Sequence, residues 1–371
     1  VPHDFALDVV AGGVNSGTTD LHAVGVTNLK KACDPVAAAN GSALLGQGPE
    51  GVAFDDIRNV AVVTNYSCNS VSIINMDLAN LHNYGVPYGG VMSTFTVGAQ
   101  PLGVAVIPRL GYAVTANNGG NGTTGTASII NISNPLAPTS ATADVAVGLA
   151  PTGVGMDFDR ALALVANTGS NTISAIDLTV LLPGAVTTTT PVSTPIAVGG
   201  PPNSIAVDPN RAIAVVTNLQ NSGTSTAVGG LDVIALSTQP PTRSTSASIN
   251  TLTANPTGIV YDPAPTTALF YATSTQQNAV YAFNPDTTAT QLVRVGINPF
   301  SIAYNYQTGI MLTINSTSNT MSVVDTQTFT TQETLGISSQ SQFSAAMDNF
   351  NNTAVIVDQN NNRVLLLAMP K

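Results

Sequence analysis

Residues suited to catalysis are few in this chain and widely spaced. The three histidines are His3, His22 and His82, and Glu50 is one of only two glutamates. Two of the histidines lie near the N-terminus and the third lies in a long polar segment, so they assemble neither a zinc site nor a serine triad. The Gly-rich segment 118–122 lacks the Lys of a phosphate-binding loop. No catalytic residue is therefore predicted, and cation binding at a carboxylate is the chemistry left open.

The composition restricts the class of protein. The 371 residues are 43% hydrophobic and 8% charged, the opposite of a disordered chain. Ten Lys and Arg against twenty Asp and Glu give a net charge of −10, which leaves no basic stripe for phosphates, so nucleic acid is not expected as a partner. Apolar runs such as 161–166 are far shorter than the roughly 18 residues of a membrane-spanning helix, so no transmembrane segment is expected.

The surface residues are typical of an exported protein. Lys occurs only at positions 30, 31 and 371, whereas Asn, Thr, Ser and Gly are abundant. The chain begins at Val1 and shows no charged and apolar leader, so we expect that a signal peptide has been removed or that the chain is an excised piece. We predict an oxidising, extracellular setting.

A repeated segment dominates the sequence. It has a Pro, a variable residue, a Gly or Ser and then apolar residues, and it often ends in Asp, as in 49–55. Seven copies occur at intervals of 43 to 54 residues, which predicts a repeat architecture. Arg58, Arg109, Arg160 and Arg211 keep a spacing of 51 through the first four copies. The copies begin at Pro49, Pro101, Pro151, Pro202, Pro256, Pro299 and Gln342.

Each copy contains four short segments with the pattern of β-strands. In the first copy they are 49–55, 60–65, 70–74 and 94–98, and Asn and Gly mark hairpin turns between strands. Four antiparallel strands per 40 to 50 residues or so are typical of a propeller blade. We predict an all-β fold, a seven-bladed β-propeller of four-stranded antiparallel blades over residues 38–371, with residues 1–37 as an N-terminal arm.

Closure of the ring needs an additional strand, because the chain ends after the third strand of the last blade, at 363–367. Since 45–49 aligns with 97–101, which follows a fourth strand, we predict that an N-terminal strand at 38–45 completes the last blade. The arm has further strand-like stretches, including 22–27. It either packs on the outside of the ring or donates a strand to a neighbouring subunit.

The second strands carry a recurring signature. It reads Val62-Val63-Thr64-Asn65 in the first copy, 113–117 in the second is Ala-Val-Thr-Ala-Asn, and 215–218 in the fourth is Val-Val-Thr-Asn. With the strand after each turn, these segments resemble YVTN-type β-propeller repeats over about residues 38–371. Copies five and seven depart from the signature at 271–273 and 356–358. Secreted and surface-layer proteins of bacteria and archaea are common in that family, so the resemblance implies a bacterial or archaeal surface protein that acts as a binding scaffold.

One face of such a ring carries the start of every inner strand. The second residue of each copy should therefore surround the mouth of the central channel, and only Glu50 is charged there. Calcium-dependent propeller hydrolases and lactonases hold the ion at such a mouth, and Glu50 with Asn203 would supply two of the six to eight or so oxygens that calcium takes. We expect no cofactor, with Ca²⁺ at these residues as the alternative. The mouth positions are Glu50, Leu102, Thr152, Asn203, Thr257, Phe300 and Phe343.

Asn ends many second strands, and Asp ends many first strands. We interpret both as turn residues that bond to local backbone, against the alternative that a ring of Asn amides binds glycans. The long loops on the same face, 117–126 and 218–230, are better candidates for ligand binding. The candidate binding residues in them are Asn117, Asn121, Thr124, Asn218, Asn221 and Thr224.

Two covalent features are predicted. Cys33 precedes the predicted closing strand and Cys68 lies in a turn of the first blade, so a disulfide between them would tie the arm to the ring; the alternative is two buried thiols. Glycosylation sequons matter only if the organism glycosylates Asn. They lie at Asn40, Asn65, Asn121, Asn131, Asn315 and Asn351.

Two classes of function are consistent with these residues. We predict a secreted or cell-surface, non-catalytic binding or structural module whose partner is a protein or polysaccharide at the cell surface or further copies of itself, assembled into a surface layer or filament. The alternative is a calcium-dependent lactonase-like or hydrolase-like enzyme, which the two Phe residues at the mouth weigh against. The chain is alternatively one domain of a larger surface protein.

Overall fold

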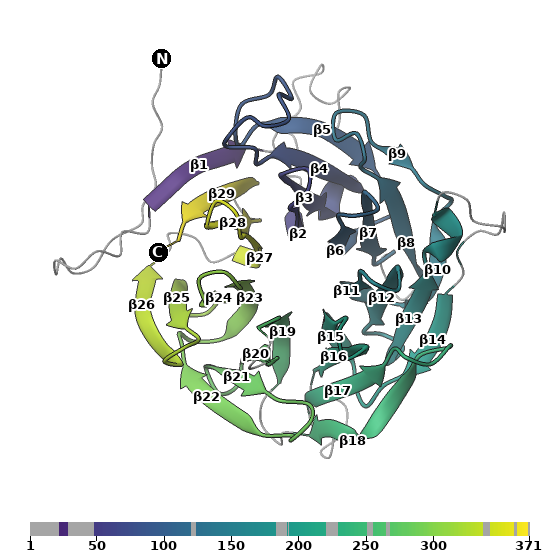
Figure 1. The fold of residues 1–371 in the computed structure, drawn as a ribbon, viewed down its shortest axis with the longest axis vertical. Coiled ribbons are helices and arrows are strands. Elements are labelled where there is room, and N and C mark those ends of the chain that lie inside the picture. Colours follow the sequence, from purple (N-terminus) through teal and green to yellow (C-terminus); the bar gives the residue numbers. More distant parts are fainter. Residues whose placement is uncertain are drawn as a thin grey trace.

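Seven β-sheets surround a central channel in the computed structural model of this protein, and each sheet is one blade of a propeller (Figure 1). The strands of a blade are antiparallel and are ordered from the channel outward. The predicted seven-bladed, four-stranded propeller is confirmed, with a two-residue strand, β9, added to the second blade. The structure describes residues 22–28, 48–119, 124–182, 191, 193–219, 229–250, 255–264, 268–336, 342–359 and 362–369.

The first six blades use consecutive strands, which run from the channel outward in the order of the chain. Blade one has β2 (Pro49–Asp55), β3 (Val60–Asn65), β4 (Ser70–Asn75) and β5 (Val91–Thr96), and blade two has β6 (Pro101–Ile107), β7 (Tyr112–Asn117), β8 (Thr124–Asn131) and β10 (Val145–Leu149), with β9 (Thr139–Ser140). Blade three has β11 (Pro151–Asp157), β12 (Leu162–Asn167), β13 (Thr172–Asp177) and β14 (Ser193–Ala197), and blade four has β15 (Pro202–Asp208), β16 (Ile213–Asn218), β17 (Gly230–Ala235) and β18 (Thr242–Asn250). Blade five has β19 (Pro256–Tyr261), β20 (Phe270–Ser274), β21 (Ala279–Phe283) and β22 (Thr290–Arg294), and blade six has β23 (Pro299–Asn305), β24 (Ile310–Asn315), β25 (Thr320–Asp325) and β26 (Thr330–Gly336). Blade seven has β27 (Gln342–Asp348), β28 (Thr353–Asp358), β29 (Arg363–Ala368) and β1 (His22–Asn28).

This order of strands gives the ring two different faces. On one of them, which we call the crossover face, each outer strand leads into the inner strand of the next blade, and each second strand turns into the third. On the other, which we call the hairpin face, each inner strand turns into the second strand, and in the first six blades the third strand connects to the fourth.

The second strands are the most buried part of the ring because neighbouring blades cover both of their faces. Every residue of β3 is buried: Val62 packs toward blade two, and Val63 packs toward blade seven. A strand covered on both sides needs apolar residues throughout, which is why these segments are continuous apolar runs. A fully buried aliphatic side chain contributes about 1.5–3 kcal/mol, so packing between blades stabilises the ring.

The arginines spaced by 51 residues join each of the first four blades to the next one. Arg58 Nη1 donates to Pro108 O of blade two at 2.7 Å. The same guanidinium pairs with Asp55 at the end of β2, and the Asp55 carboxylate accepts the backbone N–H of Arg58 at 3.0 Å. The interpretation of these Asp residues as turn residues is confirmed. The other bonds between blades join Arg109 to Phe158 O, Arg160 to Pro209 O and Arg211 to Ala268 O.

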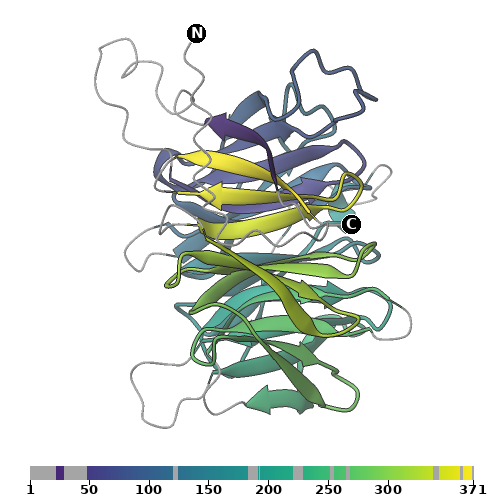
Figure 2. The ribbon, with the colours of Figure 1, turned by 90° about the vertical axis from the view of Figure 1, so that its left-hand side faces the viewer.

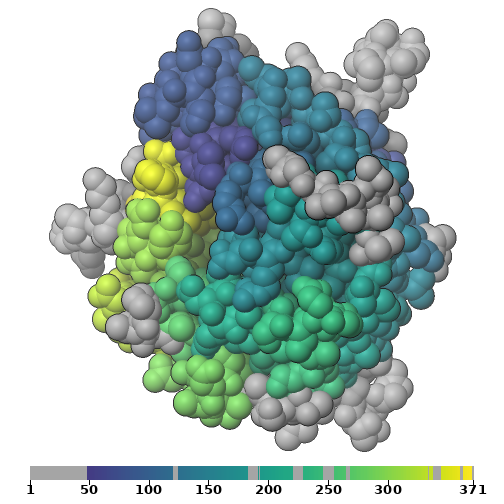
Figure 3. Space-filling view, turned by 45° about the vertical axis from the view of Figure 1, so that its right-hand side comes forward, coloured from purple at the N-terminus to yellow at the C-terminus, as the bar shows by residue number. Residues whose placement is uncertain are grey.

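An N-terminal strand closes the ring, as predicted, but at a different position. β1 (His22–Asn28) pairs antiparallel with β29, from His22 opposite Ala368 to Asn28 opposite Arg363. Figures 1 and 2 show β1, in purple, beside the yellow strands of blade seven, and Figure 3 shows the purple-to-blue surface of blade one bordering the yellow surface of blade seven. The predicted position, 38–45, is therefore wrong, because residues 22–28 occupy the edge of β29.

The displacement has a physical cause. Between the other blades the outer strand leads to the next inner strand through a short connection, such as 97–100, and the alignment of 45–49 with 97–101 assumed the same spacing. The connection from the closing strand to blade one is much longer, because β1 ends at 28 and β2 begins at 49. The spacing seen between the other blades therefore does not apply to it. Residues 38–45 lie outside the described residues, as do 1–21.

Helix is limited to two short 3-10 turns in the described part of the chain, η1 (Tyr66–Cys68) and η2 (Thr179–Leu181). Neither turn has the length or the apolar sequence that a membrane crossing requires. Cys68 ends η1 on the crossover face. Its predicted disulfide partner, Cys33, lies outside the described residues, so the disulfide stays a prediction.

Candidate functional site

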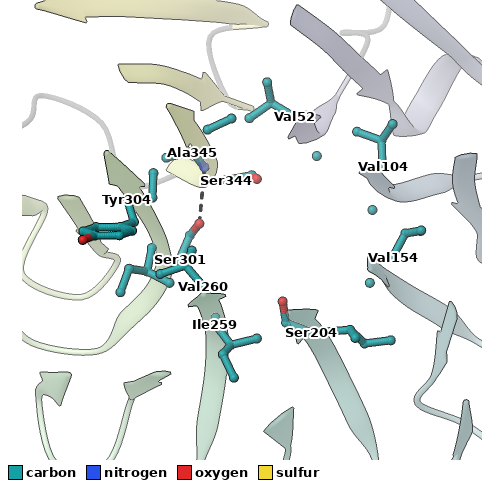
Figure 4. Close-up of a pocket in the computed structure, with 18 of the residues that line it drawn as sticks. Val52, Val104, Val154, Ser204, Ile259, Val260, Ser301, Tyr304, Ser344 and Ala345 are labelled. Carbon is teal, nitrogen blue, oxygen red and sulfur yellow. Dashed lines mark hydrogen bonds between the residues drawn. The ribbon is translucent and has the colours of Figure 1, made fainter. Parts of the chain in front are cut away.

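The central channel has an uncharged wall. Its cavity of about 330 Å³ is lined by the inner strands of all seven blades, and the described residues of this lining include no Lys, Arg, His, Asp or Glu. Ser204, Ser301 and Ser344 face the channel, and Ser301 Oγ accepts the N–H of Ala345 at 3.3 Å (Figure 4). Burial raises the pKa of Tyr304 in this wall to about 12, so it is neutral at ordinary pH. The wall therefore offers hydroxyl groups and apolar surface.

The crossover face of the channel is built as the sequence predicts. A cavity of about 310 Å³ there is lined by six of the seven predicted mouth positions and by the Gly or Ser residues that follow them. Glu50 is the single charged residue among those described in this lining. The six positions are Glu50, Leu102, Thr152, Asn203, Thr257 and Phe300.

Glu50 lies at the seam between the first and last blades. Gln359, which follows β28, donates from Nε2 to Glu50 Oε1, and the N–H of Gly48 donates to Asn362 Oδ1 at 3.1 Å across the same seam. Burial raises the pKa of the Glu50 carboxyl from 4.5 to about 7, against the lowering effect of the hydrogen bond from Gln359. The folded protein therefore holds a partly protonated glutamate at this mouth near neutral pH.

Replacing Glu50 with Gln should stabilise the fold above neutral pH. Because the folded-state pKa lies above the ordinary value, the stability from the neutral carboxyl is full below pH 4.5 and is lost as the pH rises through about 7. The variant avoids this loss, so its free energy of unfolding should exceed the wild-type value by roughly 1–2 kcal/mol at pH 8 and match it at pH 4.5. Denaturant melts at both pH values measure this, with Asp177→Asn as the control. A variant less stable than the wild type at pH 8 would mean that the site favours the charged carboxylate.

The two predicted calcium ligands belong to different blades and already have partners. Asn203 Nδ2 donates to Thr257 O of blade five at 3.0 Å, and Glu50 accepts the hydrogen bond from Gln359. Among the described residues, no group of three or more His, Cys, Asp or Glu is placed to hold a metal ion. Calcium takes about six to eight oxygens, and Glu50 and Asn203 would supply two of them.

The Asn residues that end the second strands are buried. Asn65 Nδ2 donates to the hydroxyls of Ser70 and Ser72 at 3.1 and 3.0 Å, and Asn218 Nδ2 donates to Asp232 Oδ2 at 2.9 Å. These bonds join the second strand to the third strand of the same blade. The structural interpretation is correct, although the partners are side chains of the third strand and not turn backbone. Equivalent bonds form at Asn117, Asn167 and Asn315.

This burial corrects two sequence-based assignments. Asn117 and Asn218 cannot offer their amides to a ligand, because both are buried with those amides already bonded. A glycan on Asn65 or Asn315 is incompatible with the fold for the same reason. Thr124 is exposed at the start of β8, and Asn131 and Asn351 are partly exposed. Four assigned residues lie outside the described part of the chain: Asn40, Asn121, Asn221 and Thr224.

The mouth of the channel on the hairpin face, which we call the hairpin mouth, has a different character. Its cavity of about 440 Å³ falls within the roughly 300–1,000 Å³ of ligand pockets. Phe158 and Tyr306 in its lining are 44% and 46% exposed. Its charged groups among the described residues are the carboxylates of Asp56 and Asp159 and the guanidinium of Arg109. The remaining lining residues are Phe54, Ile57, Val106, Pro108, Met347 and Asn349.

Negative charge accumulates on one side of the hairpin mouth. Burial and then the charge of Asp55 raise the pKa of Asp56. Burial raises the pKa of Asp348, and the charge of Asp56 adds to that rise. Asp55 is paired with Arg58, whereas Asp56 and Asp159 of the mouth form no ion pair among the described residues. This side of the mouth therefore attracts a positive group.

Exposed apolar side chains gather on the hairpin face. Ten large hydrophobic residues are exposed in the described part of the chain: seven lie on this face, two on the crossover face and one on β22. Four of the seven, Ile57, Phe158, Tyr306 and Phe350, stand in the turns between first and second strands, and Phe350 is 72% exposed. Contiguous apolar surface is typical of interaction sites, so the hairpin face is the candidate interaction surface. The other three are Leu78, Leu81 and Leu136.

Sequence reasoning missed this face because function was expected in the longest loops, on the opposite side of the ring. A signal was nevertheless present. In blades one, three, six and seven the turns after the inner strands are mainly polar, yet each contains a large apolar or aromatic residue, at 57, 158, 306 and 350. These four residues are exposed, whereas Leu110 in the equivalent turn of blade two packs against the core.

Comparison with known proteins supports the fold and no finer assignment. Neither a protein family model nor a curated protein matches the chain. Among solved structures, the chain is similar to hydrazine synthase of Kuenenia stuttgartiensis, with 13% sequence identity and a TM-score of 0.70 over 87% of this chain and 96% of that chain. At this identity the likeness shows the propeller fold alone, since one fold serves many functions. The resemblance to YVTN-type repeats stays a prediction.

Proposed function

We propose that the chain is a secreted or cell-surface propeller that acts as a non-catalytic binding or structural module, and that it docks through the hairpin face onto further copies of itself to form a surface layer or filament. The observation that carries the proposal is the collection of seven of the ten exposed large hydrophobic residues of the described chain on that face. Removing such side chains from water drives association without any directional chemistry. A chain with 8% charged residues is also poorly suited to steering a charged substrate.

The scaffold holds these side chains rigidly. The N–H of Phe350 donates to Asp348 Oδ1 at 3.0 Å, and the carbonyl of Phe158 accepts from Arg109 at 2.9 Å. A side chain displayed on a fixed turn loses little conformational freedom when a partner covers it. The same Asp and Arg contacts that join the blades therefore favour binding at the hairpin face.

Removing apolar surface from the hairpin face should abolish self-association. We expect the molar mass of the full-length wild type, measured by light scattering, to rise with concentration, and the double variant Phe158→Ser/Phe350→Ser to stay monomeric. The matched control is Leu149→Ser/Ile297→Ser, which removes two residues of 36% and 52% exposure from the crossover face and should associate like the wild type. A wild type that stays monomeric, or a control that dissociates equally, would contradict the proposal.

The hydrolase alternative has one observation in its favour. Glu50 has a pKa of about 7 in a cavity at the channel mouth, and such a shift is common among catalytic acids and bases. Calorimetric titration with Ca²⁺ distinguishes the two functions. Stoichiometric binding that Glu50→Gln abolishes would favour the enzyme, whereas our proposal expects no such binding.

A further inference from the structure

The arginines of this chain are almost all used internally. Five of the seven form ion pairs within their own chain: Arg58, Arg160, Arg211, Arg243 and Arg363. The two without an ion pair among the described residues are Arg109, which lines the hairpin mouth, and Arg294 on β22. Arg109 lies in the same cavity as Asp56 and Asp159, so Arg294 is the arginine outside that mouth that is available to a carboxylate of another molecule.

Arg294 stands beside an exposed apolar residue on the outside of the ring. β22 is the outermost strand of blade five, and its residues alternate between exposed and buried at 292, 293 and 294. Leu292, at 38% exposure, and Arg294 are exposed on the same side of β22, and Arg294 Nη1 donates to Gln277 O. Leu292 is the one exposed large hydrophobic in the described chain that belongs to neither face. We call Leu292 and Arg294 together the β22 ridge.

We infer that the β22 ridge of one copy seats in the hairpin mouth of the next copy. The inference rests on the proposed self-association and names the surface that covers the hairpin face. Asp56 and Asp159 have no ion pair among the described residues and would receive the Arg294 guanidinium in charge-assisted hydrogen bonds. Phe158 and Tyr306 would cover Leu292 and the aliphatic part of Arg294, and their rings also attract a cation.

The charges also decide the geometry of the assembly. Two hairpin mouths placed face to face would bring together four carboxylates, Asp56 and Asp159 of each copy, and only the two Arg109 guanidiniums, so the excess of like charge disfavours a closed dimer. Contact between two different surfaces is head-to-tail, so a pair of copies keeps one free mouth at one end and one free ridge at the other. Such a contact propagates as an open chain unless its rotation closes a ring.

A charge swap tests the contact directly in the full-length protein. We expect Arg294→Glu and Asp159→Arg each to weaken self-association at least tenfold, because each places like charges in the contact. The double variant Arg294→Glu/Asp159→Arg reverses both charges and should recover most of the association. Thr124→Arg, which adds a cation at an exposed position on the crossover face, should associate like the wild type. Circular dichroism and melting of each variant check that the fold is intact.

The outcomes separate this inference from the proposed function. If Phe158→Ser/Phe350→Ser abolishes association while the charge variants leave it unchanged, the hairpin face is the docking surface and the β22 ridge is the wrong occupant. Single charge variants that weaken association without recovery in the double variant also overturn the pairing of Arg294 with Asp159. A wild type without concentration-dependent association overturns both.

Discussion

Replacing Gly103 with Ser should destabilise the protein by more than about 3 kcal/mol, a larger effect than most overpacked sites show. A Cβ atom at this position would lie 2.3 Å from Thr152 O and 3.0 Å from the Cα of Gly153. Both atoms belong to the backbone of the neighbouring inner strand, which cannot move aside as a flexible side chain can. Equilibrium denaturation of the variant and the wild type measures the effect.

The chain supplies a matched control for this prediction. Ser204 stands at the equivalent position of blade four, so the same side chain is accepted there. We expect Ser204→Ala to change the unfolding free energy by less than about 1 kcal/mol. If Gly103→Ser were equally mild, the close approach of the inner strands in blades two and three would be relaxed in solution. Gly51 and Gly153 face the same 2.3 Å contact with the next blade and should behave like Gly103.

Removing residues 1–28 should open the ring. β1 pairs with β29 at six residues, and each lost hydrogen bond costs about 0.5–1.5 kcal/mol. The deletion also exposes the edge of β29 to other chains. We therefore expect a lower melting temperature and irreversible aggregation on heating, measured by calorimetry and light scattering in dilute solution.

The control is a deletion of residues 1–21, which keeps β1 and should melt like the full chain. The comparison separates ring closure from any other effect of shortening the N-terminus. A protein lacking 1–28 that stays monomeric and melts at the parent temperature would show that β1 does not hold the ring closed in solution.

Most of the fold could be predicted because the seven copies repeat the same local requirements. Every blade needs an apolar second strand, because neighbouring blades cover it on both sides. Six of the seven copies also place a Pro at the start of the inner strand, so the strand assignment in one copy supports the assignment in the others. The closing strand could not be placed in this way, since it occurs once and has no neighbouring copy for alignment. Its alternation at 22–27 was visible, but nothing local distinguishes a strand that joins β29 from one that packs elsewhere.

The candidate site was only half predictable. The ring of positions around Glu50 follows from the repeat alone, because equivalent residues of a propeller surround one axis. Neither the pKa of Glu50 nor the burial of Asn65 could be read from the sequence, since both depend on contacts such as Gln359, which is 309 residues away, and Ser72 on the third strand. The apolar surface of the hairpin face could not be predicted either, because it depends on which turn residues the folded chain leaves exposed to solvent.

Hydroxyl-radical footprinting of the full-length protein tests the central claim most directly, because it reports the exposure of individual side chains. The rates of oxidation at Phe158, Tyr306 and Phe350 would be compared between a dilute sample and one concentrated enough to assemble. We predict that all three rates fall several-fold on assembly, while the rate at Ile297 on the crossover face is unchanged. Protection of Ile297 with continued oxidation of the three aromatic residues would contradict docking through the hairpin face.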